Sequence, residues 1–322
     1  MLTRVRSPHR TLTRLAAGAI GIATAAAALA GCSTSDPLQS SAPAPGTAAP
    51  GTTAAGGGTL VVGSQQYYSN EIIAELYAQA LEKAGYTVER QFQIGQREVY
   101  LPELEAATID VLPEYSGNLL QYYDKETQVS DAASVTAALA SALPDGLRVL
   151  AAADASDQDS YTVTKAFADE HGLTSIADLA KAPQPVKLAA NSEFATRPYG
   201  PEGAKATYGV DIELVPVEDS GGPLTVRALS DGTVQVADLY TADPAIAKEG
   251  FVVLEDPEGL ILPQNVVPLV SQKVDAAAAA AIEAVNAKLT ASELQQLNAR
   301  SVDEQARSAD IARDWLSAQG LA

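Results

Sequence analysis

The chain from residue 59 to residue 112 alternates short β-rich apolar runs with segments of helical periodicity. The first run is Thr59-Leu-Val-Val-Gly63, whose composition favours a strand. Apolar residues then recur along one helical stripe, namely Ile72, Ile73, Leu76, Tyr77, Ala80 and Leu81. Further strands are predicted at 86–94 and 109–112, with a second helix at 97–107. This order predicts a parallel sheet with right-handed crossovers.

We expect the first helix of the chain to begin with Ser69 as its N-cap and to end at Gly85. The remainder of the chain repeats the same alternation of strands and helices. Later strands are predicted at 148–152, 161–163, 186–190, 213–217, 233–239, 251–254 and 265–270. Later helices are predicted at 130–143, 165–171, 176–179, 200–208, 223–229, 275–289, 291–299 and 302–319. Two α/β units therefore follow one another, and 322 residues are enough to bury two cores.

Residues 1–31 have the pattern of an export signal. Arginines precede an apolar run from Leu15 to Ala30, and small residues come before Cys32. The run is shorter than the roughly 20 residues that a membrane-spanning helix needs. Leu29-Ala-Gly-Cys32 resembles a bacterial lipobox, which implies that Cys32 becomes the lipidated first residue of the mature protein. A plain signal peptide with a chance cysteine is the alternative.

Residues 32–58 are rich in Ala, Pro, Gly, Ser and Thr, so we expect a flexible tether. The formal net charge is −19. It becomes −23, from 17 basic and 40 acidic residues, if the four arginines of the signal are removed. This charge argues against nucleic acid as a partner and is compatible with a cationic ligand.

The stretch from Thr108 to Asn118 places polar residues beside a predicted buried strand. We expect Pro113 and Gly117 to break the strand and to leave Glu114 and Tyr115 at its carboxyl end. In open α/β sheets, ligands bind at that end. Four later stretches also set Tyr or Gly beside acids, at 157–161, 194–199, 220–224 and 238–244. We expect all five to converge on one cleft.

Signs of catalysis are weak. His171 is the one histidine outside the signal, and it falls at a predicted helix end, where histidine often interacts with the helix dipole. The nucleophile-elbow, Walker and dinucleotide-binding motifs are absent. Residues 154–159 resemble a Ca²⁺ loop but lack its hinge glycine and distal glutamate. We expect no enzyme, metal or cofactor, although an acid-pair hydrolase stays open as an alternative.

The aromatic residues are strongly skewed towards tyrosine, with 12 Tyr against 4 Phe and 1 Trp. Tyrosine rings around a quaternary ammonium group bind it through cation–π attraction. Six tyrosines stand beside Gly, Pro or Asp at expected strand ends, namely Tyr67, Tyr68, Tyr115, Tyr161, Tyr199 and Tyr240. Each of them is equally compatible with packing in a core, and spacing alone does not unite them in one site.

Six segments of the chain resemble the substrate-binding lipoproteins of bacterial osmoprotectant ABC transporters, which take up choline, glycine betaine and carnitine. The segments are 63–76, 109–117, 220–229, 237–246, 250–256 and 264–269, in the same order as in that family. The resemblance covers Thr59 to Leu321. It implies an α/β, two-lobed periplasmic-binding-protein fold of type II, with a mostly parallel sheet in each lobe and closure on ligand.

The resemblance also implies an aromatic box for the trimethylammonium group. Tyr67 matches the aromatic residue after the first strand. Tyr115 matches the Pro-Glu-Tyr aromatic residue, and Tyr240 the one in Asp-x-Tyr-Thr. Another ring comes from the segment that holds Phe194 and Tyr199, and the choice between these two stays open. Tyr68 departs from the Thr or Ser usual at its position, which would reshape the box.

Charged residues bear on which solute is bound. Arg197 is the best placed basic residue for a ligand carboxylate, as glycine betaine would require. Asp157, Asp159 and Asp238 would instead favour a pure cation such as choline, unless they are solvated loop or N-cap acids.

We therefore expect a monomeric receptor that is lipid-anchored on the outer face of the cytoplasmic membrane and delivers a quaternary-ammonium solute to an ABC permease. Lobe one is predicted at 59–160 plus 263–322, and lobe two at 161–262. Three alternatives remain: an aromatic or polyphenolic ligand in the same fold, a hydrolase, or a purely structural lipoprotein.

Overall fold

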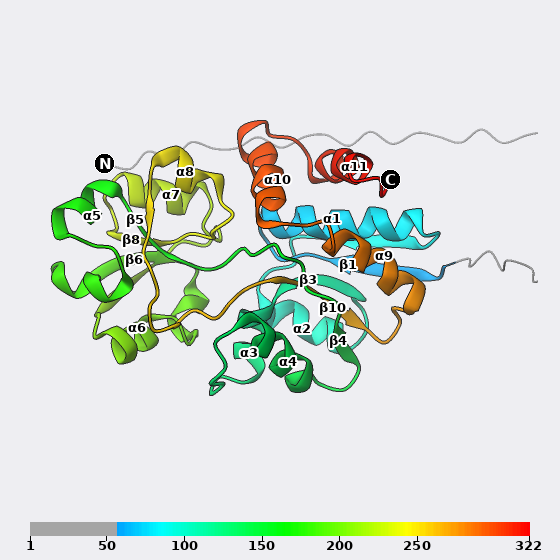
Figure 1. Cartoon of the computed structure of the whole chain (residues 1–322), viewed down its shortest axis with the longest axis horizontal. Coiled ribbons are helices and arrows are strands. Elements are labelled where there is room, and N and C mark those ends of the chain that lie inside the picture. The colour runs from blue at the N-terminus through cyan, green and yellow to red at the C-terminus, as the bar shows by residue number, and fades with distance from the viewer. Residues whose placement is uncertain (1–56) are drawn as a thin grey trace, which may run out of the picture. The chain divides into compact units, whose positions relative to one another are not determined.

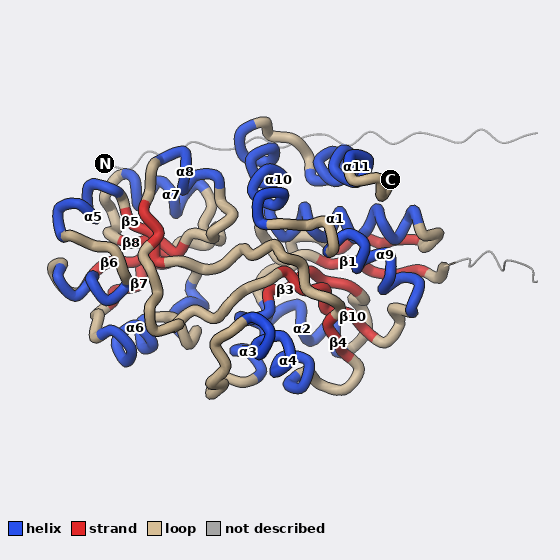
Figure 2. Tube along the Cα trace, viewed as in Figure 1, coloured by secondary structure: helices blue, strands red, loops and turns tan. Residues whose placement is uncertain are grey.

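The computed structural model describes residues 57–322, which form two five-stranded sheets flanked by helices (Figures 1 and 2). The first sheet has the order β2-β1-β3-β10-β4 and the second the order β7-β6-β8-β5-β9. The first comprises β1 (Thr59–Gly63), β2 (Thr87–Gln91), β3 (Val111–Tyr115), β4 (Leu147–Val149) and β10 (Val266–Ser271). The second comprises β5 (Tyr161–Val163), β6 (Val186–Ala190), β7 (Ile212–Pro216), β8 (Val236–Asp238) and β9 (Val252–Val253). We call the two sheets with their helices the first and second lobes.

The chain crosses from the first sheet to the second through residues 150–160 and returns through residues 254–265. Each sheet is mixed, because the strand that follows each crossing enters from the other lobe rather than through a strand–helix–strand unit of its own sheet. Strand β10 runs antiparallel to β3 and β4, and β5 runs antiparallel to β8 and β9. The α/β two-lobed expectation is confirmed, and each sheet is mostly parallel, with β10 and β5 as the antiparallel strands.

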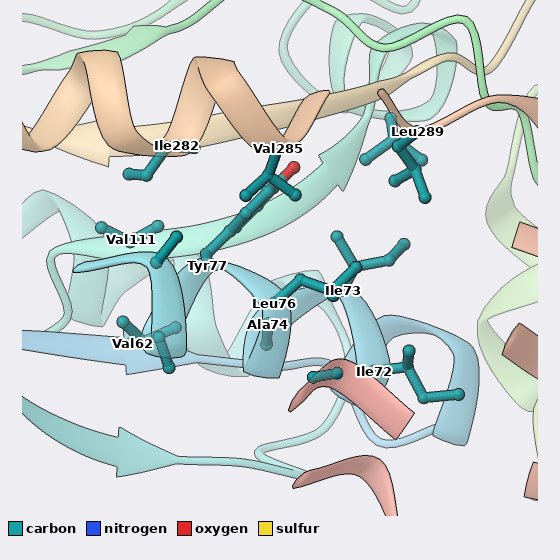
Figure 3. Close-up of a cluster of buried hydrophobic side chains, with 14 of the residues drawn as sticks. Val62, Ile72, Ile73, Ala74, Leu76, Tyr77, Val111, Ile282, Val285 and Leu289 are labelled. Atoms are coloured by element: carbon teal, nitrogen blue, oxygen red, sulfur yellow. The ribbon is translucent and has the colours of Figure 1, made fainter. Parts of the chain in front are cut away.

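The first sheet is covered on both faces. Alternate residues of β3 point to opposite sides, so Val111 joins one apolar cluster and Leu112 the other. The helices of this lobe are α1 (Tyr68–Lys83), α2 (Arg97–Glu105), α3 (Ser116–Tyr123), α4 (Ala132–Ala142), α9 (Ala276–Asn286), α10 (Ala291–Asp303) and α11 (Ser308–Ala318). Helix α1 packs in the first cluster beside α9 and α11 (Figure 3). There the Tyr77 hydroxyl donates to Asn286 Oδ1 at 2.6 Å, which satisfies two buried polar groups.

The second lobe is built in the same way around a shorter set of elements. Its helices are α5 (Lys165–His171), α6 (Pro201–Tyr208), α7 (Pro223–Ser230) and α8 (Pro244–Glu249), with 3₁₀ turns at Ile176–Lys181 and Ser192–Thr196. Leu188 and Ala189 of β6 belong to apolar clusters on opposite faces of the sheet. This lobe is thus also a sheet between two apolar layers.

Strand β3 is longer than expected, and no break occurs at Pro113. The strand continues to Tyr115, and Pro113 lies opposite Pro268 of β10. The two prolines do not hydrogen-bond to each other. The Pro113 carbonyl accepts from Asn70 Nδ2, and the Pro268 carbonyl accepts from the Leu150 amide. A position that needs no ladder hydrogen bond tolerates a residue without an N–H. Helix α3 then begins directly at Ser116, a helix that was not predicted from the sequence.

Two further expectations about local structure are wrong. Ser69 is not an N-cap, because α1 begins at Tyr68 after Tyr67, and the Ser69 hydroxyl donates to Asp157 instead. The sequence analysis also missed α8, a short helix that begins with Pro244. Its N-cap Asp243 accepts a hydrogen bond from the Ala245 amide at 2.7 Å, which is the standard role of aspartate at that position.

The predicted signal, the lipidation site Cys32 and the tether up to residue 56 lie outside the described residues. Among residues 57–322, no helix is both long enough and apolar enough to span a membrane.

Candidate ligand-binding site

One cavity is lined by residues of both lobes and of the two segments that cross between the sheets. Nine of the residues singled out from the sequence line it, namely Tyr67, Tyr115, Asp157, Asp159, Phe194, Arg197, Tyr199, Asp238 and Tyr240. Of the five stretches expected to converge, 220–224 does not line the cavity. Its Ser220 instead accepts a hydrogen bond from Asn191, a lining residue, at 2.9 Å.

Tyr68 is the candidate that the structure places elsewhere. Its hydroxyl donates to Asp243 Oδ2 at 3.1 Å, which joins α1 of the first lobe to the start of α8 in the second. The side chain lines a different cavity, together with residues of α7 and α8. The departure at this position from the usual Thr or Ser therefore adds a contact between the lobes.

Three tyrosine rings from three separate elements are grouped at one side of the main cavity. Tyr67 joins β1 to α1, Tyr115 ends β3, and Tyr240 follows β8. The Tyr67 ring centroid lies 6.4 Å from that of Tyr115 and 5.0 Å from that of Tyr240. Burial raises the pKa of all three phenols above the ordinary value, so they are neutral at physiological pH. Neutral rings in this arrangement suit a quaternary ammonium group.

Phe194 and Tyr199 both line the cavity, so the structure does not force a choice between them. Their rings are 5.7 Å apart in an edge-to-face arrangement. Tyr161 supports them from β5, with its ring 6.1 Å from Phe194 and its hydroxyl donating to the Tyr199 carbonyl at 2.7 Å. The position of this second aromatic group is thus fixed by a buried hydrogen bond as well as by packing.

Asp157 lies in the first crossing segment and contacts both lobes. Its Oδ2 accepts from the Ser69 hydroxyl of α1, and its Oδ1 from the Ala242 amide after β8, each at 2.9 Å. Asn298 of α10 donates to Ser69 and to the Ala242 carbonyl, both at 3.1 Å. Burial raises the pKa of Asp157 to about 7 despite these hydrogen bonds. The carboxyl group therefore holds the lobes together at the edge of the cavity.

Two arginines line the cavity, and each is already paired. The sequence analysis singled out Arg197, whose Nη1 donates to Glu98 Oε1 of α2 at 2.9 Å. Arg97 was not singled out from the sequence. It is only 5% exposed and donates to the Glu114 carboxylate from Nε and Nη2, at 3.0 and 2.8 Å. Tyr100 also donates its hydroxyl to Glu114, at 2.5 Å. Neither guanidinium is free of a carboxylate partner in this structure.

Other polar lining residues were missed as well, and the position at a strand end could have revealed two of them. The missed residues are Gln65, Gln96, Arg97, Asn118, Asn191, Glu193 and Gln264. Gln65 follows β1 and Asn191 follows β6, at the carboxyl ends of parallel strands. The side-chain nitrogen Nε2 of Gln65 is buried without a hydrogen-bond partner. Because an unpaired buried donor costs free energy, this group is available to a ligand oxygen.

Several contacts hold the two lobes against each other around the cavity. Gln66 Nε2 donates to Ser220 Oγ at 3.0 Å. Lys248 of α8 pairs with Asp303 of α10 at 2.7 Å. Together with the Arg197–Glu98 and Tyr68–Asp243 contacts, these interactions describe a closed arrangement of the lobes.

The described part of the chain matches the model of a known protein family. The model for OpuAC, the substrate binding domain of ABC-type glycine betaine transport system, matches residues 58–318. The chain belongs to this family. OpuAC domains are solute-binding proteins of ABC transporters and not enzymes, which agrees with the absence of catalytic motifs in the sequence.

Individual relatives agree with the family assignment. The glycine betaine-binding protein YehZ of Escherichia coli is 27% identical over 277 residues, covering 80% of this chain and 90% of YehZ. A glycine-betaine-binding protein of Pseudomonas aeruginosa is 26% identical over 271 residues, covering 80% and 87%. A crystal structure of a glycine betaine/carnitine/choline ABC transporter protein superimposes with a TM-score of 0.65 at 20% identity, covering 82% of this chain and 98% of that one. The last match confirms the two-lobed fold.

Proposed function

We propose that this protein is the extracytoplasmic receptor of an ABC importer and binds a quaternary-ammonium solute, such as glycine betaine, choline or carnitine, in the cavity between its lobes. The observation that carries the proposal is the group of Tyr67, Tyr115 and Tyr240 around one side of that cavity. Three neutral rings supply cation–π attraction to a charge that has no N–H to donate. The glycine betaine-binding relatives support the same ligand class.

Lobe closure is the second part of the proposal. Lobe one is residues 59–160 and 263–322, and lobe two is residues 161–262. The strands of each sheet fall within these ranges, which supports the division. Ligand binding stabilises the closed arrangement, which then docks on the permease, and lipidation of Cys32 keeps the monomeric receptor at the outer face of the membrane.

Thermal unfolding with added solutes tests the ligand class. We expect choline, glycine betaine, carnitine or proline betaine to raise the unfolding temperature by several degrees. A ligand at 100 times its Kd adds about 2.7 kcal/mol, and each kcal/mol is about 2–4 °C for a protein of this size. The uncharged choline isostere 3,3-dimethylbutanol is the matched control and should give little shift, since it lacks the cation. No shift with any quaternary amine would contradict the proposal.

A further inference from the structure

Two carboxyl groups of the cavity lie side by side without a cation. Asp238 is the last residue of β8, and Asp159 comes two residues before Tyr161, which is the β-sheet partner of Asp238. The register therefore sets the two side chains at the same edge of the second sheet, where both line the cavity. They are 8% and 6% exposed, and neither takes part in an ion pair among the described residues.

Neighbouring groups fix the position of the pair without neutralising it. Asn118 Nδ2 donates to Asp159 Oδ2 at 2.6 Å, and Gln264 Nε2 donates to Asn118 Oδ1 at 2.8 Å. The Ser160 amide donates to Asp238 Oδ1 at 3.2 Å. Glu193, which also lines the cavity, adds a third negative charge near Asp238.

The same cavity contains a buried polar group without a hydrogen-bond partner. The Nε2 atom of Gln65 makes no hydrogen bond, and Gln65 is 3% exposed. Acids alone would not define a site. The two acids lie in the same cavity as the unpaired side-chain amide of Gln65 and the three grouped tyrosine rings. Together these groups point to a ligand that carries both a positive charge and an oxygen.

We propose that Asp159 and Asp238 determine the specificity of this cavity. The pair compensates the charge of a quaternary-ammonium alcohol of the choline type, and Asp238 releases its proton to solvent when that ligand enters. This inference rests on the proposed function and narrows it to pure cations in preference to zwitterions.

The charge balance of the cavity supports this selectivity. Two adjacent carboxylates in a buried site cannot both ionise without a nearby cation, so one keeps a proton. A quaternary ammonium group supplies that cation, and a ligand hydroxyl can donate to a carboxylate oxygen. A zwitterion would bring its own carboxylate close to the acids. The two arginines that could receive that carboxylate are held by Glu114 and Glu98.

The affinity for choline should therefore rise with pH. Burial and the neighbouring Asp159 raise the pKa of Asp238 well above its ordinary value. Cation binding favours the doubly ionised pair, so it releases a proton below that pKa and becomes up to about tenfold tighter per pH unit. Tyr161, Tyr199 and Tyr240 also face the pair, but their own pKa values are raised and they stay neutral. Asp157 and Glu193 titrate in the same cavity, so a variant must isolate the pair.

The Asp238→Asn variant isolates the contribution of the Asp159–Asp238 pair from that of the other acids. The asparagine Oδ1 can still accept from the Ser160 amide, and its Nδ2 can donate to Asp159, so the variant imitates the singly protonated pair. The test is titration calorimetry of the full chain with choline and with glycine betaine, at about pH 5 and pH 8, in two buffers of different ionisation enthalpy. The difference between the buffers gives the number of protons released. Asp231→Asn, on the exposed end of α7, is the matched control.

We expect the unchanged protein to bind choline more tightly than glycine betaine and to release more protons on binding it than the Asp238→Asn variant. At pH 8 the variant should lose roughly tenfold or more in choline affinity and keep its glycine betaine affinity, while Asp231→Asn changes neither. Asp159→Asn should repeat the result if the first variant unfolds at a lower temperature. Tight binding of glycine betaine with proton release unchanged by both variants would overturn the inference and leave the proposed function standing. If no quaternary amine binds the unchanged protein, both fail.

Discussion

Replacing Glu114 with glutamine is expected to lower the free energy of unfolding by about 3–5 kcal/mol. Glu114 is fully buried at the end of β3 and accepts hydrogen bonds from Arg97, Tyr100 and the Tyr115 amide. Without its charge, the guanidinium of Arg97 would be buried with no counter-ion. Denaturant unfolding monitored by circular dichroism measures the change, and the unfolding temperature should fall by about 6–20 °C.

An exposed ion pair of the same chemistry is the control. Arg90 pairs with Glu82 through two short contacts, but Glu82 is 42% exposed. Glu82→Gln should therefore cost less than about 1 kcal/mol. Combining Glu114→Gln with Arg97→Met should recover part of the lost stability, because it removes the uncompensated charge. Equal and small effects of Glu114→Gln and Glu82→Gln would show that the buried pair does not hold the first lobe together at the site.

Replacing Tyr67 with alanine is expected to weaken the binding of a quaternary-ammonium ligand by about 30-fold or more. The Tyr67 ring adjoins both Tyr115 and Tyr240, so its loss removes one π-face and loosens the other two. A desolvated cation–π contact contributes about 2 kcal/mol, which corresponds to roughly 30-fold in Kd. Titration calorimetry with choline or glycine betaine gives the Kd of each variant.

Two variants make this test specific. Tyr67→Phe keeps the ring and should retain affinity within a few-fold, since it preserves the π-face that contacts the cation. Tyr122→Ala removes a tyrosine that stacks edge-to-face on Tyr123 and lies outside the main cavity, so its affinity should match that of the unchanged protein. Binding that survives Tyr67→Ala but not Tyr122→Ala would place the ligand away from the three tyrosines.

Much of the fold could be predicted because local patterns and burial agree. The helical stripe of α1 and the apolar runs of β1 and β6 are continuous in the sequence, and each forms the predicted element. The error at Pro113 has a tertiary cause. Proline is tolerated in β3 because its partner is Pro268, which lies 155 positions along the chain, and no local pattern reveals that pairing.

The aromatic part of the candidate site could be predicted because strand ends and the family resemblance coincide at Tyr67, Tyr115 and Tyr240. Its charges could not be predicted in the same way. Arg97 reads as a surface residue at the start of a helix, and only the fold brings it onto the buried Glu114. Asp159 and Asp238 are 79 residues apart in sequence, and the β5–β8 register brings them together.

A crystal structure of the protein grown with choline or glycine betaine tests the central claim most directly. We expect a trimethylammonium group in contact with the rings of Tyr67, Tyr115 and Tyr240, with the lobes closed around it. A ligand bound elsewhere, for example in the cavity beside Tyr68 and α7, would contradict the proposed site, as would a main cavity that stays empty at saturating ligand.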